Sequence, residues 1–175
     1  MQSIVIDGVV RDLSHLKEFV VTLTGKGKEG GDLRVGVSFG LHTISKASVF
    51  GQHNMNDENG NPRSFCEDRY AFSLGLPALA TRMVEQNFFC WESTDRNRAM
   101  HYAVIDVAPG PVVNLVDGEH EVVFFYLYPA LNDDMDVKLI VASCYSRLLT
   151  FGRIKRRYNV HTLLRKCLYN GVRLP

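Results

Sequence analysis

The histidine at position 42 has the surroundings that most favour acid–base chemistry. It follows a predicted strand and lies in the stretch SFGLHTISK (38–46), where hydroxyls and the ammonium of Lys46 accompany the imidazole. A histidine exchanges protons near neutral pH, and a strand end holds it rigidly at the surface, which suits a general acid or base. Gly40 permits an unusual backbone angle just before it. The alternative is a surface histidine in an ordinary turn.

Two arginines in the sequence RSFCEDRYAFS form a second candidate group. Arg63 and Arg69 are predicted to clamp a phosphate, because a guanidinium group matches phosphate oxygens bidentately. Arg69 and Ser73 are four residues apart and share one face of a predicted helix. The alternative is that each arginine pairs with a neighbouring surface carboxylate, Glu67 or Asp68.

A third group lies on the predicted strand LIVASCYSR. Ser143, Tyr145 and Arg147 alternate along it, so they should project from one face and offer hydrogen-bond donors to a phosphodiester. The alternative is a row of cross-strand hydrogen bonds without function. The opposite face is predicted to carry Ile140, Ala142 and Cys144.

Charge is distributed unevenly along the chain. The whole chain carries a formal net charge of +1 and its last 29 residues carry +8, so the first 146 residues carry −7. Such asymmetry favours a polyanionic partner, most often nucleic acid. The alternative is a basic helix that is only a solvated face or that packs on the acidic body. The basic residues are Arg147, Arg153, Lys155, Arg156, Arg157, Arg165, Lys166 and Arg173.

The elements that must position these residues begin with short strands. Period-two alternation predicts one over Leu33–Phe39, and strand-forming residues predict two more. The segment GKGKEGGD is a predicted loop that lacks the order of a phosphate-binding P-loop, and the segment NMNDENGNP is a predicted exposed loop. Helical spacing predicts a helix over Asp68–Gln86 that breaks near Gly75 or restarts at Pro77. The two further strands are Ser3–Ile6 and Phe19–Thr24.

Four successive runs rich in Val, Phe, Tyr and Ile then predict an antiparallel meander, because turn-forming residues connect them. A final helix is predicted over Val160–Tyr169, with Asn159 as its cap and Gly171 at its end. The chain thus reads as one α+β domain, with helices on one face of the sheet and a basic C-terminal helix. It divides into strands and loop (1–32), core (33–147) and basic extension (148–175). The four runs are Phe88–Glu92, Met100–Val107, Glu121–Tyr128 and Val137–Cys144.

Composition narrows the class of protein. A chain of 175 residues with 46% hydrophobic residues buries enough surface to need no disulfide or metal staple. The cysteines form no CxxC pair and the histidines form no HExxH motif, so neither a metal nor another cofactor is indicated. No apolar run reaches the length of a membrane span, and no signal-peptide core is present. We therefore expect a cytoplasmic protein with no membrane contact, and buried thiols at Cys90 and Cys144.

The layout resembles the barnase–EndoU–colicin–RelE group of small ribonucleases. The likeness lies in a helical stretch with Arg69-Tyr70 and a four-stranded meander whose last strand ends in Ser143-Cys-Tyr145, and it covers about residues 33–147. Toxin-type nucleases of phages and mobile elements are the most similar members. The resemblance implies cleavage of RNA without a metal, by attack of the ribose 2′-hydroxyl on the adjacent phosphate.

The resemblance also implies roles for individual residues. His42 would be the acid–base group, while Lys46, Arg69 and Arg147 would hold the phosphate. Ser143 and Tyr145 would be the polar pair of the last strand. The cations expected to bind the rest of the nucleic acid are Arg63, Arg153, Lys155, Arg156 and Arg157.

Two other functions remain open on the sequence. The first is a non-catalytic protein, such as an inhibitor encoded by a phage or mobile element, whose basic end holds nucleic acid or an acidic protein. The second is an assembly protein whose basic end docks on another subunit. A catalyst needs His42, Arg69 and Tyr145 in one place, whereas a binding protein needs only a surface patch. In the binding case, we expect that residues 153–175 can be removed without unfolding the rest.

Overall fold

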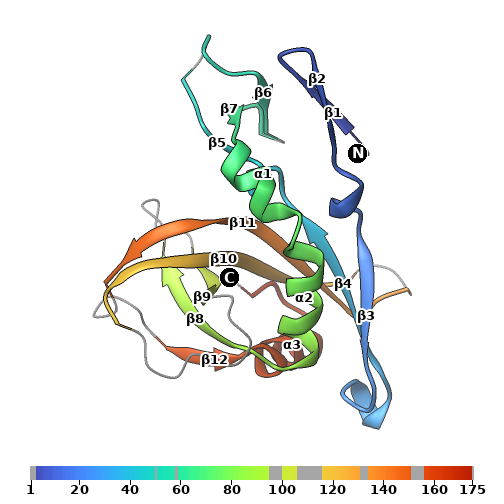
Figure 1. The fold of residues 1–175 in the computed structure, drawn as a ribbon. Helices are drawn as coiled ribbons and strands as arrows, with labels where there is room; N and C mark the ends of the chain where they lie inside the picture. The colour runs from blue at the N-terminus through green and yellow to red at the C-terminus, as the bar shows by residue number, and fades with distance from the viewer. Residues whose placement is uncertain are drawn as a thin grey trace.

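The molecule is built around a seven-stranded sheet. A computed structural model describes residues 3–49, 51–57, 59–94, 100–105, 116–130, 134–150 and 156–174. The strands follow the order β12-β8-β9-β10-β11-β4-β3 across the sheet (Figure 1). Their bounds are β3 (Phe19–Leu23), β4 (Leu33–Phe39), β8 (Phe89–Thr94), β9 (Met100–Ile105), β10 (Gly118–Pro129), β11 (Val137–Leu149) and β12 (Arg157–Asn159).

The predicted meander is confirmed, since β8, β9, β10 and β11 pair in sequence order and antiparallel. The rest of the sheet departs from the prediction in one respect. β4 lies parallel to β11, with Val35 opposite Val137, so the sheet is mixed rather than wholly antiparallel. The chain between these two strands is long enough for such a crossover, because it contains the helices. The α+β class is confirmed.

A β-bulge at Ala142 changes which side chains of β11 share a face. Phe124 of β10 lies opposite Ser143, whereas the next residue, Phe125, lies opposite Val141. The extra residue reverses the alternation, so Val141 and Cys144 both enter the main core. The prediction that Ile140 and Cys144 share a face was therefore wrong.

In the described part of the chain, three α-helices accompany the sheet: α1 (Glu67–Ser73), α2 (Leu76–Glu85) and α3 (Val160–Asn170). The predicted break is confirmed, because Gly75 caps α2 and Pro77 lies in its first turn, where no backbone donor is needed. The main core joins α2 and α3 to one face of the sheet. Its fully buried residues include Leu76, Met83, Val84, Leu163, Leu164, Phe125, Leu127 and Leu139.

The basic C-terminal helix is part of this core. Asn159 precedes α3 as predicted, but its side chain makes no capping bond; Asn87 Oδ1 instead accepts from the His161 backbone amide. Gly171 ends α3 in the left-handed backbone conformation (φ 63°). Beyond it, Leu174 pairs with Leu127 of β10, at a position on that strand where β9 is not paired. The expectation that residues 153–175 can be removed without unfolding the rest does not fit this packing.

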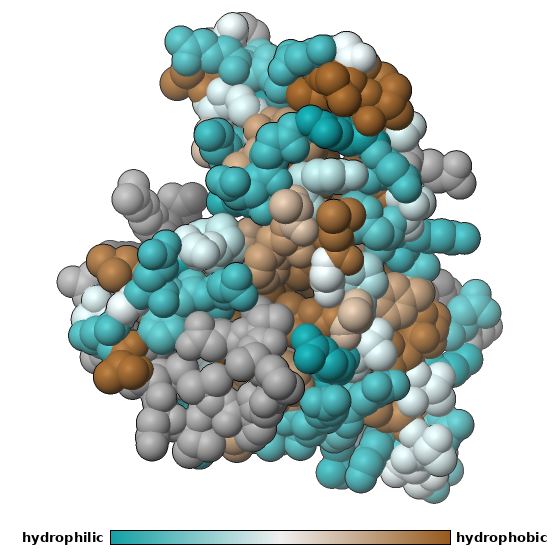
Figure 2. Space-filling model, viewed as in Figure 1, coloured by the Kyte–Doolittle hydropathy of each residue, from teal (hydrophilic) through white to brown (hydrophobic). Residues whose placement is uncertain are grey.

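Two small sheets extend from the large one. The first is a hairpin of β1 (Ser3–Ile6) and β2 (Val9–Asp12), and Figure 2 shows an apolar patch over it, where Val5, Val9 and Val10 are exposed. The second consists of β5 (Ser45–Ala47), β7 (Pro62–Phe65) and β6 (Met55–Asn56), so the predicted loop over 54–62 contains strand residues. Three short 3-10 helices are η1 (Ser14–Leu16), η2 (Lys28–Gly30) and η3 (Leu41–Thr43).

The other face of the meander carries a second, smaller cluster. Trp91, Val122 and Phe124 are buried there, and Tyr145 packs against them with its ring 5.5 Å from that of Phe124. Trp91 therefore belongs to packed apolar structure. Tyr126 and Tyr128 are half-buried, and the Arg173 guanidinium lies 5.1 and 5.0 Å from their ring centroids.

Cysteine chemistry gives a direct check of the core. Burial raises the pKa of Cys144 to about 12, although the nearby Arg69 charge opposes this, and burial also raises the pKa of Cys90. In the native protein we expect a thiol reagent to modify half-buried Cys66 much faster than these two, because only the accessible thiolate reacts. Peptide mapping after timed alkylation measures this. Modification of Cys90 or Cys144 as fast as Cys66 would contradict the packing.

Candidate functional site

His42 lies on the single turn of η3, directly after β4. Gly40 has ordinary backbone angles (φ −79°, ψ 157°), so the unusual angle that a glycine permits is absent. Its amide donates to the Val141 carbonyl at 2.8 Å, and a Cβ at this position would lie 3.3 Å from the Ala142 carbonyl, a tight contact. The bulge in β11 and the start of η3 thus lie in close contact.

The His42 imidazole pairs with an aspartate that the sequence analysis did not single out. Nε2 lies 3.4 Å from Oδ2 of Asp57, and the His42 side chain is 41% exposed while that of Asp57 is 4% exposed. A carboxylate beside one ring nitrogen holds the proton on that nitrogen and leaves the other with a free lone pair. The pair therefore presents Nδ1 as an acceptor on an accessible ring.

Asp57 is ionised at neutral pH. Burial alone would raise its pKa, but hydrogen bonds from Asn61 and Asn59 and from His42 lower its pKa to about 2. Oδ1 accepts from the backbone amides of Asn59 and Asn61 at 3.0 and 2.9 Å. The signal in the sequence was an Asp followed by two asparagines and a glycine, which indicates a turn closed by an Asp side chain. That pattern predicts a turn but does not predict a histidine partner.

Arg63 and Arg69 both donate hydrogen bonds to Ser45, the first residue of β5. Arg69 Nη1 donates to the carbonyl oxygens of His42 and Ser45 at 2.9 and 2.6 Å. Arg63 is buried and donates to the same Ser45 carbonyl at 2.8 Å and to the Ser45 hydroxyl at 3.1 Å. These bonds hold the segment that carries His42. They favour a positioning role for the buried Arg63 over the predicted phosphate clamp.

The last strand of the meander reaches the same cluster through Tyr145. The Arg69 guanidinium carbon lies 4.5 Å from the centroid of the Tyr145 ring. Arg69 therefore contacts both the backbone of His42 and the ring of Tyr145. Ser143 is half-buried two residues before Tyr145, and Arg147 is exposed two residues after it, opposite His120.

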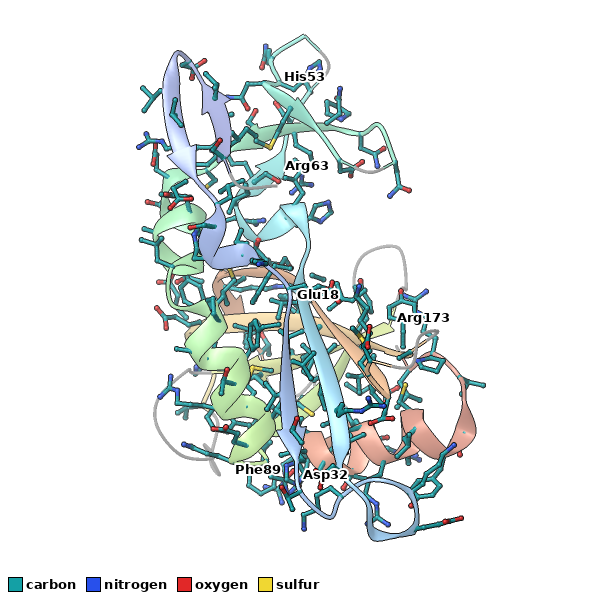
Figure 3. All side chains as sticks on the ribbon, turned by 90° about the vertical axis from the view of Figure 1, so that its right-hand side faces the viewer. Glu18, Asp32, His53, Arg63, Phe89 and Arg173 are labelled. Carbon is teal, nitrogen blue, oxygen red and sulfur yellow. The ribbon has the colours of Figure 1, made fainter. Side chains whose placement is uncertain are left out.

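The other predicted cations divide between the two ends of the molecule. Lys46 is exposed on β5, next to Ser45. Arg156 and Arg157 are exposed at the opposite edge of the sheet, where Arg157 lies 4.4 Å from the Phe89 ring. Figure 3 shows Arg63 near the upper end and Phe89 near the lower end. Four strand spacings separate β12 from β11, about 19 Å. Arg153 and Lys155 lie outside the described residues.

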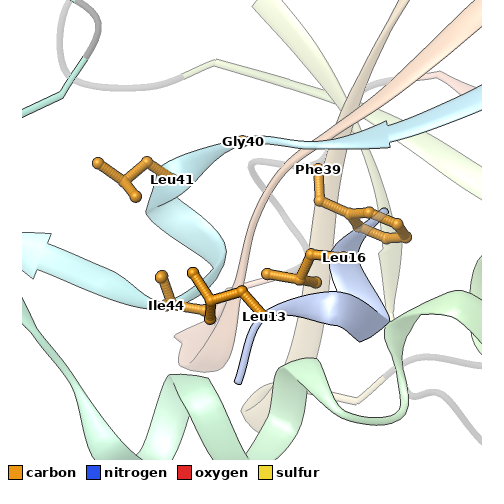
Figure 4. Close-up of a pocket in the computed structure, with 6 residues that line it drawn as sticks. All are labelled: Leu13, Leu16, Phe39, Gly40, Leu41 and Ile44. Carbon is orange, nitrogen blue, oxygen red and sulfur yellow. The ribbon is translucent and has the colours of Figure 1, made fainter. Parts of the chain in front are cut away.

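A small apolar pocket adjoins η3. It has a volume of about 210 Å³, and Figure 4 shows its walls, which come from the η1 region and from the end of β4. Aliphatic side chains and one aromatic ring make up the lining, so it suits an apolar group more than a phosphate. The lining residues are Leu13, Leu16, Phe39, Gly40, Leu41 and Ile44.

Among the residues that the structure describes, no three His, Cys, Asp or Glu side chains gather closely enough to hold a metal ion. Within the same part of the chain, no helix has the length and apolar character needed to cross a membrane.

Comparison with known proteins gives one match. A family model described as the YjaZ family matches residues 3–168. No curated protein and no solved structure matches the chain significantly. The likeness to small ribonucleases stays a prediction. The family match covers nearly the whole sequence, from the first strand to α3, and this protein therefore belongs to the YjaZ family.

Proposed function

We propose that this protein is an endoribonuclease that uses His42 as its general base. The observation that carries the proposal is the pairing of an accessible imidazole with a buried, ionised Asp57. A surface histidine in an ordinary turn has no need of such a partner. The contacts from Arg69 to the His42 segment and to Tyr145 add support, because they bring three predicted site residues together.

The chemistry follows from the orientation of the ring. Nδ1 of His42 accepts the proton of a ribose 2′-hydroxyl, and the resulting oxygen forms a bond to the adjacent phosphorus. The bond from phosphorus to the 5′-oxygen breaks, and that oxygen takes a proton from water. The hydroxide that is left takes the proton from the His42 imidazolium, which restores the base. The products are a 2′,3′-cyclic phosphate and a free 5′-hydroxyl. Asp57 stabilises the imidazolium that forms on His42.

Charge stabilisation of the phosphate comes from two cations near this ring, the exposed Lys46 and the half-buried Arg69. Lys46 follows Ser45, whose carbonyl oxygen accepts from Arg69, so both positive charges lie close to η3. The developing negative charge on the phosphate oxygens is stabilised most by donors that are already in position before the reaction. Arg69 meets this condition because its hydrogen bonds to two carbonyl oxygens fix the guanidinium group.

Incubation of the purified protein with labelled single-stranded RNA and a metal chelator tests the proposal. We expect fragments that end in a 2′,3′-cyclic phosphate, identified by mass spectrometry. DNA of the same sequence should stay intact, because it lacks the attacking 2′-hydroxyl. Intact RNA in every pool tested, or equal cleavage of the DNA, would rule the proposal out.

A second candidate is a protein that binds nucleic acid without cutting it. It is favoured by the exposed cations of β12 and α3, none of which forms an ion pair with an acidic residue in the described part of the chain. An inhibitor or assembly protein would need no more than this. Binding of RNA by the unaltered protein with no product formed would select this candidate.

A further inference from the structure

The outward face of α3 lines an open groove that is not part of the proposed His42 site. Its volume is about 340 Å³ and its lining residues recur at helical spacing, so they share one face. Arg165, Lys166 and Tyr169 are exposed on it, and Tyr169 is 53% exposed. His161 is committed to the fold, because its Nε2 donates to the Val84 carbonyl. The other lining residues are Thr162 and Asn170.

The glycine-rich loop after β3 lies against the end of this face. The Tyr169 hydroxyl donates to the Gly27 carbonyl at 3.5 Å, and the flanking residues Lys26 and Lys28 are exposed. Gly27 has no room for a side chain, since a Cβ would lie 2.2 Å from the Asp32 carbonyl. The loop also carries exposed Glu29. Figure 1 shows the loop after β3 and α3 at the same end of the molecule.

The cations of α3 contact aromatic rings instead of carboxylates. The Arg165 guanidinium lies 5.9 Å from the Tyr169 ring, and the Lys166 ammonium lies 5.2 Å from the Tyr158 ring. Within the described residues neither cation forms an ion pair, so the alternative in which the basic helix is neutralised by the acidic body is disfavoured. The positive charge of this face therefore remains open to a ligand.

We propose that this groove binds the backbone of single-stranded RNA, with Arg165 and Lys166 on phosphates and one base stacked on Tyr169. Cations interleaved with an exposed aromatic ring are the features that hold single strands without sequence preference. The choice of RNA as the ligand rests on the proposed ribonuclease function. The assignment of a ligand site to the groove rests only on its exposed cations and its aromatic ring. Because α3 lies at the other end of the molecule from β5 (Figure 1), this is a second site that holds a strand away from His42.

Fluorescence anisotropy with a labelled single-stranded RNA tests the groove, in a His42→Ala background that keeps the RNA intact. Changing both Arg165 and Lys166 to Gln should reduce the slope of log affinity against log salt by about 1.4, since each lost single-strand phosphate contact removes about 0.7. Tyr169→Ala should weaken binding about 5- to 150-fold, the usual value of a stacked base, while Tyr169→Phe should bind nearly as the parent does.

Lys17→Gln is the control, because it removes an exposed cation far along the chain from α3. Unchanged affinity and salt slope in the Arg165 and Lys166 variant would overturn the proposal. Displacement of RNA by polyglutamate at lower concentration than by unlabelled RNA would assign the groove to an acidic protein and overturn the choice of RNA. Cleavage by the unaltered protein is measured separately, so failure of this site and failure of the His42 site are distinguishable.

Discussion

Changing His42 to Ala should lower the rate of RNA cleavage by about two to four orders of magnitude, the usual contribution of a general acid–base group. The physical reason is that the variant keeps the charge of Arg69 and Lys46 but has no group to accept the 2′-hydroxyl proton. Single-turnover kinetics with saturating protein measure the chemical step directly. Circular dichroism should show an unchanged fold, because the His42 side chain is partly exposed.

Two further variants make this result specific. Asp57→Asn keeps the shape of the side chain and removes its charge, so it should slow cleavage by up to about a hundredfold, the lower end of the acid–base contribution. His53→Ala is the matched control, because it removes an imidazole that is not part of the proposed site; His53 Nδ1 accepts from the Gly51 amide. This variant should cleave at nearly the full rate. Full activity in His42→Ala would remove the catalytic assignment and leave the binding function.

Removing residues 153–175 should leave a chain that is largely unfolded at 25 °C. Val160, Leu163 and Leu164 are fully buried in the main core. Their burial contributes about 5 to 9 kcal/mol at the usual value for such side chains. That is comparable with the whole free energy of unfolding of an ordinary domain, about 5 to 15 kcal/mol. Urea unfolding followed by circular dichroism measures the loss.

Full-length variants separate the packing of α3 from its charge. Leu164→Ala should lower the free energy of unfolding by about 2 to 5 kcal/mol, as expected for a fully buried leucine. Arg165→Gln with Lys166→Gln should change it by less than about 0.5 kcal/mol, because both side chains are exposed. A truncated chain that unfolds at the same urea concentration as the full chain would show that α3 is not part of the core.

Local patterns along the chain predicted most of the elements. The alternation in Leu33–Phe39 and the runs rich in Val, Phe and Tyr became strands, because each buries one or both faces in the same sheet. The break at Gly75 and the end of α3 at Gly171 were also predicted, since the first depends on the missing backbone amide of Pro77 and the second on a left-handed backbone that glycine adopts readily. These features need no knowledge of distant residues.

The bulge at Ala142 and the parallel pairing of β4 with β11 were not predictable in this way. A bulge depends on what lies opposite the strand, and here Gly40 approaches Ala142 from a segment about a hundred residues earlier in the chain. The parallel pairing depends on which edge of the meander remained free for β4. Neither property is encoded in the residues of a single strand.

The sequence by itself determined which side chains have the chemistry for a phosphate reaction, namely His42, Arg69 and Tyr145, because residue type fixes the available protons and charges. Only the tertiary structure decided what each of them contacts. It brought Asp57 to His42 by closing a turn fifteen residues away. It directed Arg69 to backbone carbonyls, because the nearest acceptors there are those of His42 and Ser45. The physical reason is that such contacts are set by three-dimensional proximity, which spacing along the chain does not specify.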